Sequence, residues 1–459
     1  MSEPRYFSSS RVLLPTGTRP AALEIVGERI ARVLERAAIP PGAPHEDFAD
    51  RVLMPGLVDT HVHVNEPGRT EWEGFETATR AAARGGITTV VDMPLNSIPP
   101  ATSPAGVATK AARTEGRCFV DVGLWGGAIP ENTTGRSRGL GELLDEGVRG
   151  FKCFLVPSGV DEFPYVQTAD VEAALAQLSG TGVSLMVHAE IAEPIDAATA
   201  ALAAAGADPK KYETYLRSRP MTAEDQAVKL LFDLAKKTRT AIHVVHLSSA
   251  GALETLKRAK DEGVPLTAET APHYLHFSSE DIPDGATWYK CAPPIREKAN
   301  RERLWEALRA GLLEMVVSDH SPCIPDLKRV ETGDFMGAWG GIAGLQYSLS
   351  AVWTGARERG FSLETVSQWM STRPARHAAL DGKKGVLAVG ADADFVVFDP
   401  EGTFTVDTAD CEHKNKLTPY DGATLHGVVH ETWVRGERVQ RTGQYGERAT
   451  GRWLARGRG

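Results

Sequence analysis

Two histidines spaced one residue apart close a short apolar run at Gly56–His63. In an extended strand, residues i and i+2 point to the same face, so the imidazoles of His61 and His63 are expected to point the same way. Imidazole nitrogen is a common ligand of divalent metals. An isolated pair of this kind is more often two ordinary strand histidines, so further residues must support a metal site.

Further candidates occupy other short apolar runs of the strand type. A lysine among apolar strand residues is costly unless it is neutralised or used in chemistry. Six such side chains in five strand-like runs indicate one shared site rather than unrelated structural residues. The additional candidates are Lys152 in Gly150–Leu155, His188 in Ser184–Ala189, His246 in Ala241–Leu247 and Asp319 in Leu313–Asp319.

These runs belong to a longer alternation of apolar strand-like and amphipathic helix-like segments, which predicts a (β/α)8 barrel over residues 55–384. Catalytic residues of such barrels lie at the carboxyl ends of the strands. The expected strands are Leu53–Thr60, Ile87–Met93, Cys118–Trp125, Gly150–Leu155, Ser184–Ala189, Ala241–Leu247, Pro265–Ala271 and Leu313–Asp319. Expected helices include Glu73–Arg84, Ala169–Ser179, Ala223–Lys237, Ala252–Glu262 and Asn300–Ala310.

The two ends of the chain have a different pattern. Short strand-like segments and few helix-like segments occur in Arg5–Val52 and Gly385–Thr442. Chain termini often lie close together. We therefore expect residues 1–54 and 385–459 to form one small β-sandwich domain built from both chain ends.

The composition argues against a nucleic-acid-binding protein, a membrane protein and a disulfide-stabilised protein. With 51 basic and 60 acidic residues the net charge is −9, and no basic patch with interleaved aromatics suggests nucleic acid as a partner. No run of about 18 apolar residues predicts a membrane span, and the first residues lack a signal-peptide core. The five cysteines are scattered and odd in number, which argues against a disulfide framework. A cytoplasmic protein with a small-molecule substrate is expected.

The candidate ligands outnumber those of a single catalytic metal. Four histidines and one aspartate exceed the usual three protein ligands, which points to two divalent ions that share a bridge. A lysine ammonium cannot ligate, because it has no free lone pair. A carbamylated lysine could bridge two metals through its two oxygens.

The pattern resembles the binuclear, carboxylated-lysine branch of the amidohydrolase superfamily, which contains dihydroorotases, dihydropyrimidinases, hydantoinases and allantoinases. The resemblance covers nearly the whole chain, including Gly385–Asp394. It implies that His61 and His63 bind one ion with Asp319, that His188 and His246 bind the other, and that carboxylated Lys152 bridges them. Zinc suits these ligands best, although cobalt, manganese or iron could occupy the same site. The family also implies a homotetramer.

Several residues near the assigned ligands have other interpretations. We interpret His243 and His320 as outer partners or structural residues, because ligating histidines usually have such partners. His273 is as compatible with packing as with lining the pocket. Cys153 and Cys323 are interpreted as small buried hydrophobic residues, and so is Cys291.

The substrate is indicated by Asn65, which stands where dihydroorotases carry an arginine for the substrate carboxylate. Asparagine suits a neutral, amide-rich ring. The segments Asn65–Phe75, Asp92–Ser97 and Trp339–Gln346 resemble the allantoinases in particular. The tyrosine that dihydropyrimidinases place shortly after the bridging lysine is absent, since Phe154 follows there. Expected substrate contacts are Asn65, Asn96, Cys291, Ala292 and Gly341; some relatives carry serine in place of Ala292.

The resemblance therefore implies hydrolysis of the hydantoin ring amide of allantoin to allantoate in purine breakdown. In that reaction a hydroxide shared by the two metals would attack the ring carbonyl, and Asp319 would take the proton and pass it to the leaving nitrogen. Two alternatives stay open. The first is a related amidohydrolase acting on hydantoins or dihydropyrimidines, and the second is a non-catalytic scaffold of the dihydropyrimidinase-like kind.

Overall fold

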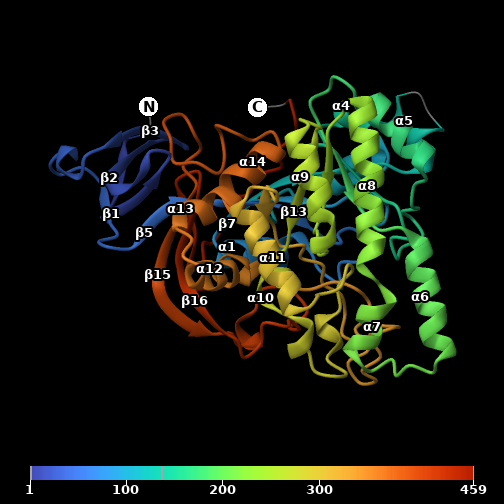
Figure 1. The fold of residues 1–459 in the computed structure, drawn as a ribbon. Helices are drawn as coiled ribbons and strands as arrows, with labels where there is room; N and C mark the ends of the chain where they lie inside the picture. The colour runs from blue at the N-terminus through green and yellow to red at the C-terminus, as the bar shows by residue number, and fades with distance from the viewer. Residues whose placement is uncertain (1–2, 136–137, 458–459) are drawn as a thin grey trace.

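The structure is a computed structural model that describes residues 3–135 and 138–457. Its centre is a set of short parallel strands surrounded by helices (Figure 1). The central strands are β6 (Leu57–Val62), β7 (Ile87–Asp92), β8 (Asp121–Leu124), β9 (Gly126–Gly127), β10 (Phe151–Phe154), β11 (Leu185–His188), β12 (Ile242–Val244), β13 (Leu266–Thr270) and β14 (Met315–Val316).

The central strands close into a barrel. β6, β7 and β8 pair in parallel, and β9 to β14 continue the parallel order. Since β8 and β9 are separated only by Trp125, they occupy one position, which leaves eight strand positions. The ring is completed where the backbone N–H of His63 donates to the carbonyl of His320 at 2.8 Å. The predicted fold class, a (β/α)8 barrel with a β-domain from both chain ends, is confirmed.

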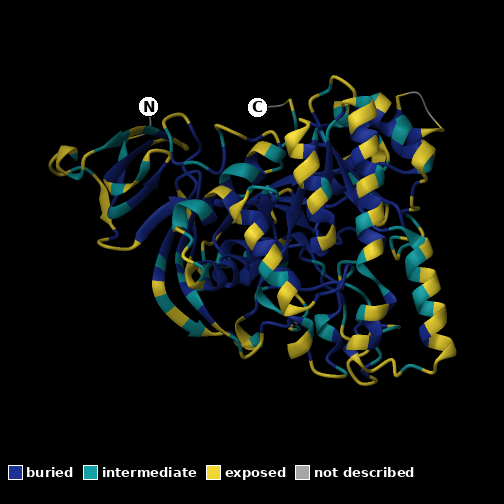
Figure 2. Ribbon diagram, in the orientation of Figure 1, coloured by how far each residue is buried: buried dark blue, intermediate teal, exposed yellow. Residues whose placement is uncertain are grey.

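Amphipathic helices cover the barrel. In α8, the buried residues Ala227, Leu231 and Leu234 recur at helical spacing and face the strands, while the outer face is exposed (Figure 2). Within the described residues every helix is too short or too polar to cross a membrane. The helices are α1 (Phe75–Arg84), α2 (Pro104–Ala112), α3 (Pro130–Thr133), α4 (Gly139–Glu146), α5 (Thr168–Leu178), α6 (Ala192–Ala204), α7 (Tyr212–Ser218), α8 (Met221–Thr238), α9 (Leu253–Asp261), α10 (Pro272–His276), α11 (Lys298–Arg309), α12 (Ser348–Glu358), α13 (Leu363–Ser367) and α14 (Arg373–His377).

Strands from both ends of the chain form one continuous sheet in the order β18-β17-β16-β15-β5-β1-β2-β3, with β4 paired to β1. β5 pairs antiparallel with β15, and this pairing joins the blue N-terminal strands to the red C-terminal ones in Figure 1. In the separate core of this sheet, the rings of Phe395 and Trp433 stack, and the ring of Phe7 packs tilted against that of Phe395. Its strands are β1 (Arg5–Leu14), β2 (Gly17–Val26), β3 (Arg29–Leu34), β4 (His45–Asp47), β5 (Val52–Pro55), β15 (Phe395–Thr405), β16 (Thr424–Val434), β17 (Glu437–Arg441) and β18 (Gln444–Tyr445).

The first expected strand, Leu53–Thr60, is not a single strand. The run divides at Gly56 into β5, which belongs to the terminal sheet, and β6, which opens the barrel. A Cβ at Gly56 would lie 2.2 Å from Oγ1 of Thr88, so only glycine allows the chain to change sheets here. Periodicity could not reveal this break, because both halves are fully buried and show no alternation of buried and exposed positions.

The last described residues lie along the barrel rather than along the terminal sheet. The N–H of Val122 in β8 donates to the carbonyl of Arg452 at 2.9 Å, and the N–H of Leu454 donates back to Val122 at 2.7 Å. The carbonyl of Cys118 accepts from Gly451 at 2.7 Å. The expected strand Cys118–Trp125 therefore pairs with β7 only from Asp121 onward.

A buried ion cluster ties the barrel to the terminal sheet. Nζ of Lys384 lies 2.6 Å from Asp121 in β8, 2.7 Å from Asp394 and 2.9 Å from Asp392, and the Lys384 side chain is fully buried. Arg435 pairs with the second oxygen of Asp121. Burial alone would lower the pKa of Lys384, but Asp394 and Asp121 outweigh it and raise that pKa. The lysine therefore stays charged and holds three carboxylates together.

We expect Lys384→Met to lower the free energy of unfolding by about 3–5 kcal/mol, because it leaves buried carboxylates without their cation. Urea unfolding followed by circular dichroism measures this loss. The matched control is Lys383→Met at the half-buried neighbour, for which we expect a change within about 0.5 kcal/mol. Equal stabilities of the two variants would show that the cluster does not hold the two parts together.

Candidate active site

A cavity of about 570 Å³ opens at the carboxyl ends of the barrel strands. All six predicted metal-site residues line it, although they come from five different strands or strand ends. This is the end of a barrel at which catalytic groups are found. The lining residues include His61, His63, Asn65, Asn96, Lys152, His188, Tyr215, Arg219, His246, Lys290, Ala292, Asp319 and Gly341.

His61, His63 and Asp319 form a group that could hold a metal ion. One ligand atom from each lies within 4.8 Å of the others, and all three residues are buried. Nε2 of His61 lies 3.2 Å from Oδ1 of Asp319, and Nε2 of His63 lies 3.7 Å from the same oxygen. Two imidazoles and a carboxylate suit a borderline divalent metal.

The other predicted ligands surround this group. The ring of His246 lies 5.3 Å from that of His61 and 4.7 Å from that of His188. Lys152 is fully buried, and its Nζ has no hydrogen-bond partner among the described residues. This Nζ lies 4.6 Å from the centroid of the Phe154 ring. An unpaired ammonium at such a place is costly, so a partner absent from the protein itself is implied.

Five cavity residues other than glycine have left-handed backbone conformations, and four of them are predicted site residues; the fifth is Arg329. The φ angle is 38° at His246, 47° at Asp319, 68° at Asn65 and 67° at Asn96. Such conformations cost on the order of 1–3 kcal/mol for residues other than glycine and cluster at functional sites. Here they turn the chain sharply at the strand ends, so that the side chains face the cavity.

Burial sets the charge state of the cavity. It lowers the pKa of His188 to about 4, despite the opposing effect of Glu190. Burial also lowers the pKa of His63 and of His246 well below the usual value. The same cause lowers the pKa of Lys152 to about 8. Neutral imidazole is the form that ligates a metal, and a neutral amine is the form that can take up carbon dioxide.

Three of the four ligand rings have one nitrogen held by an outer partner. Nδ1 of His61 lies 2.6 Å from Glu269, and Nδ1 of His63 lies 3.1 Å from Oδ1 of Asn96. Nε2 of His188 lies 2.7 Å from Glu190. These contacts fix which nitrogen of each ring faces the cavity. The expected substrate contact Asn96 therefore also orients a ligand.

Glu269 and Glu190 were missed by sequence reasoning. Glu269 lies in β13 and its second oxygen lies 3.1 Å from His243, so one carboxylate orients two histidines. Burial alone would raise the pKa of Glu269, but His61 and His243 outweigh it and hold that pKa below the usual range. Glu269 could have been singled out in the sequence, because it is a carboxylate inside the strand-like run Pro265–Ala271.

We expect Glu269→Gln to weaken metal binding by about 10- to 100-fold, because the imidazole of His61 loses its charged partner. Metal retained after dialysis against graded chelator measures the effect. Glu254→Gln on the exposed face of α9 is the control and should retain metal as the unchanged protein does. Undiminished retention in Glu269→Gln would mean that this contact does not support the ligand.

The remaining predicted residues occupy varied positions. His243 contacts Glu269 and Thr267, and His320 lies 3.4 Å from Glu73 and accepts from Gly344, so neither faces the cavity as a ligand. His273 packs against Tyr274 within α10. Of the expected substrate contacts, Asn65, Asn96, Ala292 and Gly341 line the cavity. Cys291 is buried behind that wall, and its carbonyl accepts from the hydroxyl of Tyr215 at 2.5 Å.

Residues 52–439 match the amidohydrolase family. The chain therefore belongs to the amidohydrolase family. In structure it is similar to the L-hydantoinase (dihydropyrimidinase) from Arthrobacter aurescens, with a TM-score of 0.92 and 28% identity over 99% of this chain and 100% of that one.

Within the amidohydrolase family, the chain is similar in sequence over most of its length to several allantoinases. The allantoinase of Streptomyces avermitilis is 52% identical over 98% of both chains. The allantoinase of Arabidopsis thaliana is 42% identical over 97% of this chain and 90% of its own. The allantoinase of Saccharomyces cerevisiae is 42% identical over 89% of this chain and 87% of its own. The resemblance to allantoinases that the segments Asn65–Phe75 and Trp339–Gln346 indicated is confirmed.

Proposed function

We propose that this chain hydrolyses the hydantoin ring amide of allantoin to give allantoate. The observation that carries the proposal is a ligand group of two histidines and an aspartate within 4.8 Å, at the mouth of a barrel, in a chain 52% identical to an allantoinase over 98% of its length. Asn65 in the cavity wall supports a neutral ring over one that bears a carboxylate.

Two divalent ions, zinc in the first place, would be held by this set. His61, His63 and Asp319 would hold one ion, and His188 and His246 the other. The cavity-facing nitrogens support this assignment, because the opposite nitrogens of His61, His63 and His188 are taken by outer partners. The unpaired Nζ of Lys152 supports its carboxylation, since a carboxylate there would bridge the ions.

When bound, such ions polarise a carbonyl oxygen and lower the pKa of water. The protein's own contribution is positioning and proton transfer. Burial raises the pKa of Asp319, although His61 and Lys152 oppose it, so its carboxylate accepts a proton more readily than an ordinary aspartate. From the cavity wall Asp319 would take the proton of the attacking water and return it to the leaving ring nitrogen. Asn65, Ala292 and Gly341 would orient the ring.

The first test is ring opening of allantoin by metal-replete protein, followed as allantoate, with hydantoin and dihydrouracil run in parallel. We expect strong and preferential turnover of allantoin. Turnover of the other rings alone would keep the site but overturn the substrate. A protein that binds metal and hydrolyses none of the rings would favour the scaffold alternative.

The homotetramer implied by the family is a separate proposal. It is tested by the sedimentation velocity of the full chain at several concentrations. A single species of four chains is expected, and a concentration-independent monomer would overturn it.

A further inference from the structure

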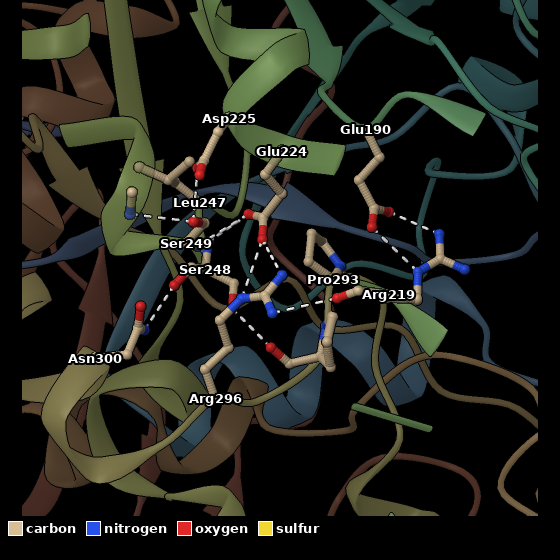
Figure 3. Close-up of polar contacts among 12 residues, drawn as sticks. Glu190, Arg219, Glu224, Asp225, Leu247, Ser248, Ser249, Pro293, Arg296 and Asn300 are labelled. Atoms are coloured by element: carbon tan, nitrogen blue, oxygen red, sulfur yellow. Dashed lines mark hydrogen bonds and ion pairs between the residues drawn. The ribbon is translucent and has the colours of Figure 1, made fainter. Parts of the chain in front are cut away.

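Arg219 lines the cavity and also pairs with a buried carboxylate. Its Nε donates to Oε1 of Glu190 at 3.1 Å, and its Nη2 donates to Oε2 at 2.7 Å. Figure 3 shows the remaining guanidinium nitrogen, Nη1, directed away from Glu190. Among the described residues Nη1 has no hydrogen-bond partner, and the Arg219 side chain is 21% exposed. A charged donor at the cavity is therefore unused by the protein.

Arg219 and the predicted metal ligand His188 contact the same carboxylate, that of Glu190. Oε2 of Glu190 lies 2.7 Å from Nη2 of Arg219 and also 2.7 Å from Nε2 of His188. Arg219 and His188 also line the same cavity, so a substituent that projects from a ring held at the ligand group toward this wall would meet Arg219. Because Glu190 already balances the charge of Arg219, the free N–H suits a neutral carbonyl oxygen rather than a second carboxylate.

Two other polar side chains of the wall, Tyr215 and Lys290, are held by hydrogen bonds to backbone carbonyls. The hydroxyl of Tyr215 donates to the carbonyl of Cys291 at 2.5 Å. Nζ of Lys290 donates to the carbonyls of Ala338 at 2.6 Å and Met336 at 3.1 Å. Both side chains line the cavity, and these hydrogen bonds hold them against the wall. The hydroxyl proton of Tyr215 and two of the three N–H groups of the Lys290 ammonium are used in this way. Arg219 differs from both because its guanidinium is fixed by two hydrogen bonds to Glu190 while Nη1 keeps its donors.

We propose that Nη1 of Arg219 donates a hydrogen bond to the carbonyl oxygen of the ureido substituent of the substrate, which makes Arg219 a specificity-determining residue. The inference rests on the proposed function, since allantoin is a hydantoin that bears this ureido group. Hydantoin itself lacks the group and cannot make the contact. Arg219 would thus discriminate allantoin from hydantoin, because it binds the ureido group, which takes no part in the reaction.

A second buried ion pair offers a matched control. Nη2 of Arg296 donates to Oε2 of Glu224 at 2.6 Å, and the other oxygen of Glu224 accepts from the N–H groups of Ser248 and Ser249, in the loop that follows His246 (Figure 3). Arg296 has the same chemistry as Arg219 but does not line the cavity. Its Nη1 donates to the backbone carbonyl of Arg219 at 3.2 Å, so Arg296→Lys perturbs the support of this segment without removing Nη1 of Arg219.

The experiment compares Arg219→Gln, Arg219→Lys and Arg296→Lys with the unchanged holoenzyme. For each we would measure kcat/KM for allantoin, turnover or competitive inhibition by hydantoin, and bound metal per chain. We expect both Arg219 variants to lose about 10- to 100-fold in kcat/KM for allantoin, the value of one hydrogen bond from a charged donor, while hydantoin changes far less. Arg296→Lys is expected to alter both compounds by the same factor.

Equal losses for allantoin and hydantoin in the Arg219 variants, accompanied by loss of metal, would overturn the inference and reduce Arg219 to a support for His188. Unchanged kinetics would overturn it as well. If one variant does not fold, the other still decides, because each removes the Nη1 contact. Failure of the unchanged protein to hydrolyse allantoin would overturn the proposed function itself, and the inference with it.

Discussion

Replacing Lys152 with alanine is expected to abolish hydrolysis of allantoin, with a loss of at least about 10³-fold in kcat. The reason is the position of its Nζ, which is fully buried, has no partner and lies among the ligand histidines. Loss of a carboxylated bridge would cost several kcal/mol of metal-derived stabilisation of the transition state, and each 1.36 kcal/mol is about tenfold in rate.

The matched variant Lys152→Met keeps an unbranched apolar stem, with sulfur in place of the δ-methylene, and removes the amine. We expect it to be as inactive as Lys152→Ala, yet to unfold at the same urea concentration as the metal-free parent or a higher one, because an unpaired buried amine is itself costly. Mass spectrometry under native conditions, after metal removal, should show the parent heavier than its sequence mass by one carbon dioxide and both variants without this addition. Near-parental turnover of either variant with two bound metals would contradict the bridging role.

Asp319→Asn is expected to lower kcat for allantoin by about 10²- to 10⁴-fold while KM changes much less. Asparagine keeps the size of the side chain and an oxygen toward the cavity, but it cannot accept the proton at the pH of the assay. The measurement is a full kinetic profile on metal-replete protein together with bound metal per chain, which separates proton transfer from ligand loss.

The control for this prediction is Asp326→Asn, an exposed aspartate that lines the same cavity. It removes the same charge and is expected to retain most of the activity. If Asp319→Asn kept its turnover across about pH 6–9, the assignment of Asp319 as the proton acceptor would be lost.

Much of this site could be predicted before the fold was known. His61 and His63 are paired by the two-residue period of a strand, and Lys152, His188 and Asp319 occupy or follow short apolar runs. Because the carboxyl ends of parallel barrel strands meet at one rim, residues distant in the chain had to converge there. The cavity lined by all six residues follows from that rule.

The outer partners could not be predicted. His61 and Glu269 are 208 positions apart, and nothing in either local segment signals their 2.6 Å contact. The same holds for Arg219, whose pairing with Glu190 depends on how α7 and the segment after it pack beside β11. Contacts of this kind arise from packing between elements and leave no trace in local periodicity.

The local apolar pattern sets the strand period and the barrel topology, and with them the residue types at the strand ends. Packing of distant segments sets where the run Leu53–Thr60 breaks, which nitrogen of His61, His63 and His188 faces the cavity, and which donor of Arg219 stays free. These three outcomes have one cause. A local pattern sets the face on which a side chain lies, but the partner that it meets there is chosen by close packing of distant segments.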